Sequence, residues 1–150
     1  MTKEEFMQKA IDLASENVKS GNGGPFGAII VKNGEIIATG VNNVTTYNDP
    51  TAHAEVTAIR NACKELNTFQ LDDCEIYSSC EPCPMCLGAI YWARPKALYF
   101  AADKDDAAEV GFDDSFLDYN SRSIATEIIK METKTQPFID WKNSEFSVEY

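Results

Sequence analysis

The sequence predicts an α/β fold in three layers, with helices on both faces of a mixed five-stranded sheet. Stretches with apolar residues at helical spacing alternate with short β-branched runs, in the order α-β-β-α-β-α-β. An Asn-Gly pair between the first two β-branched runs predicts a hairpin. The helices between the later strands predict crossover connections, and a sheet with both features needs helical layers on its two faces.

The N-terminal third of the chain is predicted to form one helix and the hairpin. Residues 2–17 carry apolar side chains at helical spacing after a Thr-x-x-Glu capping signature. A Gly-Asn-Gly-Gly-Pro turn cluster follows at 21–25, without the Lys-Ser/Thr that a phosphate-binding loop requires. Strands are expected over 26–32 and 35–41.

A second helix is expected over residues 52–67, after a loop that begins at Tyr47. Thr51 is a suitable N-cap, because its side chain can accept a hydrogen bond from the first helical turn. The apolar residues in this stretch are four and three positions apart, which predicts a buried stripe. The stripe consists of Ala52, Val56, Ile59, Cys63 and Leu66.

The sequence signals for the remaining elements become weaker towards the C-terminus. A strand is predicted over 74–79, then a helix over 84–93 that stops before an Arg-Pro pair, then a strand over 96–101. The last predicted elements are an acidic helix or loop over 103–110, a fifth strand over 123–133 and a terminal helix over 137–145.

The composition favours a single domain that acts on a small molecule. A chain of 150 residues has an ordinary length for one domain. With 13 basic and 24 acidic residues the net charge is −11, and no basic run is present, which disfavours nucleic-acid binding. We find no signal peptide and no apolar run long enough for a membrane span, so we expect a cytoplasmic protein.

Two short stretches, Thr-Ala-His-Ala-Glu at 51–55 and Glu-Pro-Cys-Pro-Met-Cys at 81–86, predict one zinc site. Zinc takes nitrogen and sulfur ligands in tetrahedral geometry, and a hydrolytic site leaves one position for water. We assign three residues as ligands: His53, Cys83 and Cys86. Glu55 would stay outside the metal's ligands and move protons, because zinc lowers the pKa of bound water to about 7.

The spacing of these residues suits a site between two helix N-termini. Cys83 and Cys86 are one helical turn apart, and Pro84 fits the first helical position. A helix N-terminus favours the thiolate, which is the form of cysteine that binds metal. His53 and Glu55 would point roughly 200° apart along a regular helix, so both must lie in its first turn with the site beyond the helix end.

Cys80 makes a second kind of metal site possible. Together with the three predicted ligands it would complete a structural Cys3His site that has no position for water. Such a non-catalytic zinc scaffold would leave Glu55 without a role. We interpret Cys63 and Cys74 as small buried hydrophobic residues.

The two metal-binding stretches match the zinc nucleobase-deaminase signature, His-x-Glu followed by Pro-Cys-x-x-Cys. On these residues the chain resembles the cytidine-deaminase-like superfamily, and more closely its bacterial guanine deaminases. Further matching segments are Gly-Gly-Pro-Phe-Gly-Ala at 23–28, Asn-Asn-Val-Thr-Thr at 42–46, Asn-Asp-Pro at 48–50 and Gly-Phe-Asp-Asp-Ser-Phe at 111–116.

The resemblance implies a cytidine-deaminase-like fold and a Zn²⁺-dependent hydrolysis of guanine to xanthine and ammonia. The substrate would be a purine base and not a nucleic acid. Deamination of guanosine is an alternative, and deamination of adenosine in tRNA is a second one, because the same metal-binding signature occurs there. The acidic net charge and the 111–116 stretch argue against the tRNA substrate.

The resemblance also implies a set of base-binding residues: Phe26, Asn42, Ala54, Trp92, Phe112, Asp114 and Tyr150. Structural alternatives are core positions for Phe26 and Trp92 and a turn position for Asn42. Guanine displays N1–H and N2–H₂ as adjacent donors, which one carboxylate can accept together. Asp114 is therefore the candidate for base selection and Asp113 the second, although the same residues are suited to capping a helix at Ser115.

A homodimer is a further implication of the resemblance. In guanine deaminases of this kind the C-terminal segment crosses to a partner subunit and closes its active site. We therefore expect one zinc deaminase domain over 1–150, with the segment 111–150 exchanged between two chains. Asp114 and Tyr150 would then serve the pocket of the neighbouring subunit.

Overall fold

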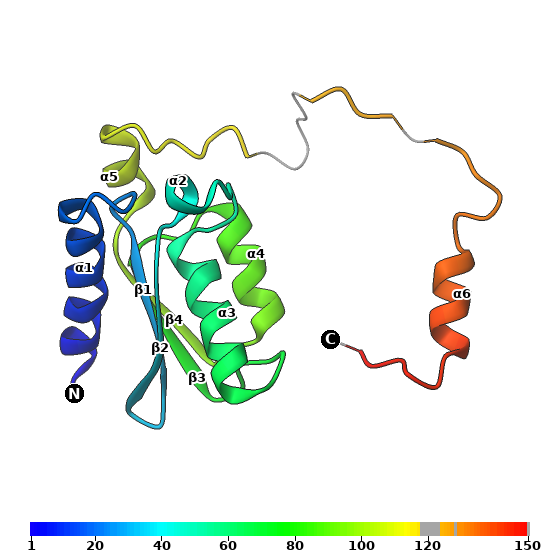
Figure 1. The fold of residues 1–150 in the computed structure, drawn as a ribbon, viewed down its shortest axis with the longest axis horizontal. Coiled ribbons are helices and arrows are strands. Elements are labelled where there is room, and N and C mark those ends of the chain that lie inside the picture. Colours follow the sequence, from blue (N-terminus) through cyan, green and yellow to red (C-terminus); the bar gives the residue numbers. More distant parts are fainter. Residues whose placement is uncertain (118–123, 128, 150) are drawn as a thin grey trace. The chain divides into compact units, whose positions relative to one another are not determined.

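The computed structural model describes residues 1–117, 124–127 and 129–149. Its helices are α1 (Lys3–Lys19), α2 (Val44–Tyr47), α3 (Ala54–Leu66), α4 (Pro84–Ala93), α5 (Lys104–Glu109) and α6 (Gln136–Asn143) (Figure 1). Its strands are β1 (Gly27–Lys32), β2 (Glu35–Val41), β3 (Cys74–Cys80) and β4 (Ala97–Ala102). The chain divides into two compact units, Met1–Phe116 and Leu117–Tyr150.

The strands of the first unit form one mixed sheet in the order β2-β1-β3-β4. β1 pairs antiparallel with β2 and β3, and β3 pairs parallel with β4. The predicted hairpin is confirmed, because Asn33 and Gly34 join β1 to β2 with φ angles of 51° and 77°. Positive φ at both central residues is what a type I′ turn requires.

Helices cover both faces of this sheet, as the sequence predicts (Figure 1). On one face, α1 packs through Phe6 and Ala10 against Ile29, Val31 and Tyr77. On the other face lie α3 and α4 with the larger core cluster. The α3 residues buried there include three alanines, Ala54, Ala58 and Ala62. Their small size lets the α3 backbone approach the strands closely.

Two predictions about α3 are wrong. Its N-cap is His53, with an extended backbone at φ −68° and ψ 158°, and not Thr51. The buried face includes Glu55 and the alanines, whereas the predicted stripe of larger apolar residues beyond Ala52 is only partly buried. The close approach of helix and sheet leaves room only for alanine beneath the helix, so the larger side chains pack at its edges.

The predicted fifth strand is also wrong for the part of 123–133 that the structure describes. Residues 124–127 and 129–133 are not in a strand, and residues 123 and 128 lie outside the described residues. β-branched residues favour strands where they pack on a half-buried surface. Ile124 and Ile129 are 79% and 76% exposed, so the described chain offers them no such surface.

The second unit contains the helix α6, which lies close to the terminal helix that the sequence predicts over 137–145. Phe138, Ile139 and Trp141 of this helix are all exposed. Among the described helices, none combines the length and the apolar character that crossing a bilayer requires.

Candidate metal centre and active site

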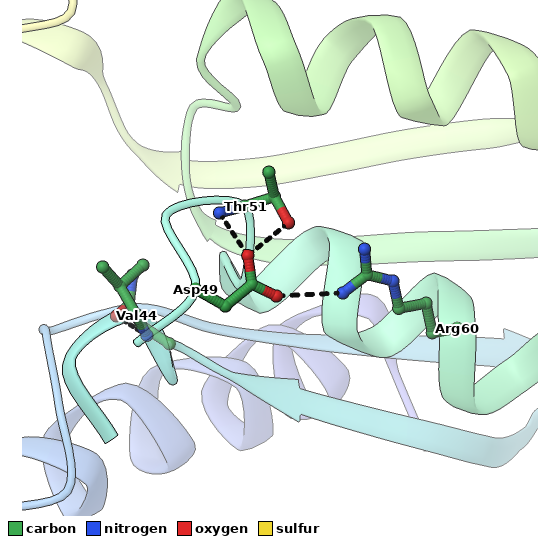
Figure 2. Close-up of polar contacts among 5 residues, drawn as sticks. Val44, Asp49, Thr51 and Arg60 are labelled. Carbon is green, nitrogen blue, oxygen red and sulfur yellow. Dashed lines mark hydrogen bonds and ion pairs between the residues drawn. The ribbon is translucent and has the colours of Figure 1, made fainter. Parts of the chain in front are cut away.

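The loop that leads to His53 is held by Asp49. One carboxylate oxygen of Asp49 accepts hydrogen bonds from the Thr51 backbone N–H at 2.8 Å and from its hydroxyl at 2.6 Å (Figure 2). The other oxygen lies 3.6 Å from Nη1 of Arg60 in α3 (Figure 2). The Thr51 hydrogen bonds in particular lower the pKa of Asp49. The loop is thereby fastened to α3, at whose N-terminus His53 lies.

Cys83 stands at the start of α4 as His53 does at the start of α3. Its backbone is extended, at φ −65° and ψ 167°, and a proline follows at the start of the helix. Cys86 is buried in the first turn of α4. Neither His53 nor Cys83 uses its side chain to cap its helix. The predicted arrangement, with the candidate ligands at two helix N-termini, is therefore present in the backbone.

The three predicted ligands lie close enough together to bind one metal ion. His53 Nδ1 is 3.6 Å from Cys83 Sγ and 3.4 Å from Cys86 Sγ. All three ligand atoms lie within 4.8 Å of one another. Tetrahedral zinc, with Zn–S near 2.3 Å and Zn–N near 2.0–2.1 Å, would separate a ligand nitrogen from a ligand sulfur by about 3.6 Å. The donor set and its spacing therefore fit zinc with one position left for another ligand.

The protonation of this cluster favours a thiolate at Cys83. Its hydrogen bonds, first with Cys86 and then with His53, lower the pKa of the Cys83 thiol to about 4. The pKa of Cys86 is raised, because Cys86 donates to Cys83 and is buried. The hydrogen bond to Cys83 raises the pKa of the His53 imidazole. A metal cation that replaced the shared protons would hold both sulfurs as thiolates.

Glu55 is buried beside these residues in the first turn of α3. Burial is the main cause of its raised pKa, and the neighbouring Cys83 raises it further. A raised pKa makes the carboxylate a stronger base, which favours accepting a proton that it can later return. The position of Glu55 is thus suited to proton transfer at a metal held by its neighbours.

Cys80 is not a member of the three-residue metal cluster in the described part of the chain. Its Sγ instead lies 3.6 Å from the carbonyl oxygen of Asp103, and burial raises its pKa to about 11. Burial also raises the pKa of Cys63 and Cys74, which pack in or against the core. These three cysteines are therefore neutral thiols, and the arrangement favours the open metal site over the closed one.

The structure brings together two of the predicted base-binding aromatic residues. Phe26 and Phe112 meet edge to face, with ring centroids 5.0 Å apart and planes at 87°. Phe26 is half-buried against the core, and Phe112 is 45% exposed. Asn42 is buried at the end of β2, where its Oδ1 accepts from the Val44 N–H at 3.2 Å. This bond assigns Oδ1 as an acceptor and Nδ2 as the donor end of the amide.

The two candidate carboxylates of the 111–116 stretch have different environments. Asp113 is exposed, and its Oδ1 accepts from the Ser115 N–H at 2.9 Å, which lowers its pKa. Asp114 is half-buried. Asp113 therefore already accepts a hydrogen bond within a local turn. No helix begins at Ser115, because residues 115–117 are not helical.

The other predicted base-binding residues lie in different places. Ala54 is the first residue of α3, where backbone N–H groups have no partner within the helix. Trp92 is exposed near the C-terminal end of α4, six residues beyond Cys86, or about 9 Å along the helix axis. Tyr150 lies outside the described residues.

Residues 1–102 match the family described as the cytidine and deoxycytidylate deaminase zinc-binding region. The chain belongs to this family. The guanine deaminase of Bacillus subtilis (strain 168) is 58% identical to this deaminase over 100% of both chains. The tRNA-specific adenosine deaminase of Aquifex aeolicus is 47% identical over 69% of each chain.

Solved structures of related proteins have the same fold as this deaminase. The X-ray structure of the guanine deaminase from Bacillus subtilis matches it with a TM-score of 0.96, over 100% of this chain and 99% of that one. A structure of the guanine deaminase from Nitrosomonas europaea matches with a TM-score of 0.72 at 35% identity, over 76% of this chain and 66% of that one.

Sequence reasoning gave no role to an asparagine that the structure of this deaminase buries near the candidate site. Asn17 lies on the buried face of α1 with Phe6, Ala10 and Ala14, whereas Val18 is exposed. A polar residue that follows an apolar stripe at helical spacing is the signal that would have identified it.

Proposed function

We propose that this chain is a zinc-dependent guanine deaminase, which hydrolyses guanine to xanthine and ammonia. The observation that carries this proposal is that a guanine deaminase resembles the chain over its whole length, whereas the tRNA deaminase of Aquifex aeolicus matches 69% of it. The net charge of −11 agrees with a small substrate, since a nucleic-acid substrate needs basic residues for its phosphates.

The chemistry would take place beside His53, Cys83 and Cys86, which are suited to hold zinc. Zinc bound there lowers the pKa of a water molecule to about 7. Glu55 accepts a proton from the attacking water, whose oxygen bonds to C2 of guanine. Glu55 then delivers this proton to N3. The second water proton passes through Glu55 to the amino group, the C2–N bond breaks and ammonia leaves.

The base would be held between aromatic and amide side chains. The edge-to-face pair of Phe26 and Phe112 supports an apolar wall, and stacking of a base on such rings contributes about 1–3 kcal/mol. Asn42 donates from Nδ2 to an acceptor of the purine. The backbone N–H of Ala54 at the start of α3 is positioned to stabilise developing negative charge.

Asp114 is proposed as the residue that selects guanine. A carboxylate accepts the adjacent N1–H and N2–H₂ donors of guanine together, and adenine does not offer that pair. Asp113 is the weaker candidate, because one of its oxygens already accepts from the Ser115 N–H. We also keep Trp92 and Tyr150 as base-binding residues implied by the family resemblance.

An ultraviolet assay of the purified protein tests this function. Guanine, guanosine, adenine, cytosine and a tRNA stem-loop are offered separately, with the Glu55→Gln variant as the control for a contaminating activity. We expect turnover of guanine alone. Turnover of the stem-loop in place of guanine would support the tRNA deaminase alternative, and turnover of guanosine would support the nucleoside alternative.

We further propose that the protein is a cytoplasmic homodimer. The residues of α4 carry no charge, and Leu87 and Tyr91 are exposed on it. A helix that is apolar on all sides is ordinarily buried on all sides, which supports a second copy of the chain as its cover. All five cysteines are free thiols, as expected in a reducing cytoplasm.

The exposed aromatic residues of the second unit support exchange of the C-terminal segment between the two chains. Phe138, Trp141 and Phe146 are among them. The contact of Phe112 with Phe26 of the same chain favours a cis position for Asp114, so we propose exchange only beyond Phe116. Tyr150 would then close the pocket of the neighbouring subunit.

Mixed dimers test this exchange. A Glu55→Gln chain and a chain that lacks Tyr150 are each expected to be inactive. Co-expressed, they should recover activity, because one pocket of the mixed dimer combines an intact Glu55 with an intact C-terminus. Failure of the mixture to regain activity, or a solution mass equal to the 16.6 kDa of one chain, would rule out the exchange.

A further inference from the structure

A buried asparagine in the last turn of α1 connects two walls of the proposed base pocket. Asn17 is 4% exposed. Its Nδ2 donates to the carbonyl oxygens of Gly24 and Asn42, both at 2.9 Å, and its Oδ1 accepts from Asn22 Nδ2 at 2.6 Å. Both donor hydrogens of the amide and its acceptor oxygen are therefore in use.

The two carbonyl groups that Asn17 contacts belong to segments that carry proposed base-binding residues. The Gly24 carbonyl also accepts from the Phe26 N–H at 2.9 Å, and the Asn42 N–H donates to the Phe26 carbonyl at 3.3 Å. Phe26 and Asn42 are thus joined through their backbones, and Asn17 contacts the chain on both sides of that link.

The loop packs closely against the chain at this link. A Cβ atom at Gly23 would overlap the Asn42 carbonyl oxygen and would lie 3.2 Å from Asn17 Nδ2. The glycine at this position therefore allows the direct contact between the loop and the end of β2. The Asn42 carbonyl group is therefore held between the amide of Asn17 and the backbone at Gly23.

The same network extends to the segment that carries the candidate metal ligand. Asn22 Nδ2 donates to Asn43 Oδ1 at 2.9 Å, and the Asn43 N–H donates to the Ala52 carbonyl at 2.9 Å. Ala52 immediately precedes His53. The last turn of α1, α2 and the start of α3 lie at the same end of the sheet (Figure 1). The network thus connects the base-binding segments to the metal-binding one.

We infer that Asn17 is a positioning residue for the purine base: it sets Phe26 and Asn42 in place relative to His53 without touching the base. This inference rests on the proposed function, because it takes Phe26 and Asn42 as residues of the base pocket. Only an amide of this length supplies two donors and one acceptor here. A carboxylate would place an oxygen against two carbonyl oxygens, and an apolar side chain would leave them unpaired.

The experiment compares Asn17→Asp with wild type in steady-state deamination of guanine, with zinc content measured on the same samples. We expect KM to rise about tenfold or more, with kcat within about threefold and zinc unchanged, as for loss of ground-state binding. Asn61→Asp is the matched control. Asn61 Nδ2 donates to the Thr39 carbonyl at 2.8 Å on the exposed side of α3, so this variant should keep the wild-type KM.

A double-mutant cycle separates positioning from general stability. In an Asn42→Ala background, Asn17→Asp should raise KM by a smaller factor, about twofold or less, because part of its action passes through Asn42. An equal factor in both backgrounds would overturn the inference, and so would a folded Asn17→Asp protein with the wild-type KM.

Two further outcomes are distinguishable. If the Asn17→Asp protein does not fold, the Asn22→Ala variant is used in its place, because Asn22 is only half-buried. The inference then requires that Asn22→Ala raise KM by about threefold. An unchanged KM in this variant overturns the inference. If wild-type protein does not deaminate guanine, the proposed function fails; if it does and the variants keep their KM, the positioning role alone fails.

Discussion

Gly40 of β2 lies directly against Ala54, the first residue of α3. A Cβ atom on Gly40 would overlap the Ala54 carbonyl oxygen and the Ala58 backbone nitrogen, and would lie 2.9 Å from the Ala58 Cα. The start of α3 is therefore in contact with the bare backbone of β2. Because His53 precedes Ala54, the position of the candidate metal ligand depends on this contact.

Gly40→Ala should lower the free energy of unfolding by about 1–3 kcal/mol, because the added methyl group overpacks the helix–sheet contact. Zinc content should fall as well, since α3 cannot move without displacing His53. Urea denaturation and metal analysis measure the two effects. Thr39→Ala, at the neighbouring exposed position, should change stability by no more than about 0.5 kcal/mol. Full zinc and unchanged stability in Gly40→Ala would contradict this account.

Cysteine substitutions distinguish the open metal site from the closed one. Cys86→Ser should lose most of the bound zinc, because Cys86 Sγ lies 3.4 Å from His53 Nδ1 within the three-residue cluster. Cys80→Ser should keep one zinc per chain, since its thiol contacts the Asp103 carbonyl instead. Metal analysis of the purified variants measures this directly. Loss of zinc from Cys80→Ser would favour the closed Cys3His site.

The parts of the fold that sequence predicts correctly depend on local signals. Asn33-Gly34 requires only its own backbone conformation to form the hairpin turn, and Pro84 sets the start of α4 in the same local way. The metal-binding residues are predictable for a chemical reason, because few residue types bind zinc and their spacing limits where they can meet.

The parts that sequence predicts wrongly or omits depend on contacts between distant segments. Alanines form the buried face of α3 because Gly40, which has no side chain, lets the helix backbone approach β2 closely. No pattern within the α3 sequence reveals this contact. Asn17 is buried because its partners, Gly24 and Asn42, are brought to it by the hairpin. The fifth strand is predicted from β-branched residues alone, and Ile124 and Ile129, which the structure describes, are both exposed.

Glu55→Gln should keep zinc and lower kcat by about 10²–10⁴-fold, which is the usual contribution of a general acid–base group. Glutamine preserves the shape of the side chain but cannot accept and return a proton. Glu65→Gln, on the exposed side of the same helix, is the matched control and should keep the wild-type rate. The ultraviolet assay with guanine measures both variants. A fully active Glu55→Gln enzyme would remove Glu55 from the mechanism.

The metal-free protein should gain stability from Glu55→Gln at neutral pH. Burial raises the pKa of Glu55 in the folded state above its ordinary value of 4.5. Protonated Glu55 therefore stabilises the fold fully below about pH 4.5, and this contribution is lost as pH rises through the higher folded pKa. Urea denaturation of chelated protein should show the advantage of Glu55→Gln at pH 8 and its disappearance near pH 4. An advantage of the same size at both pH values would show that charge burial is not its cause.

Asp114→Asn should lower kcat/KM for guanine by about 10–100-fold, the loss expected when one hydrogen-bonded charge is removed. Zinc content should stay at the wild-type level, because Asp114 is not among the three residues of the metal cluster. Asp113→Asn is the informative comparison: Asp113 is exposed and already accepts from the Ser115 N–H, so its loss should have a smaller effect on guanine turnover. Steady-state kinetics with guanine measures both variants. A greater loss in Asp113→Asn than in Asp114→Asn would exchange the roles of the two carboxylates, and equal wild-type rates would exclude both from the base pocket.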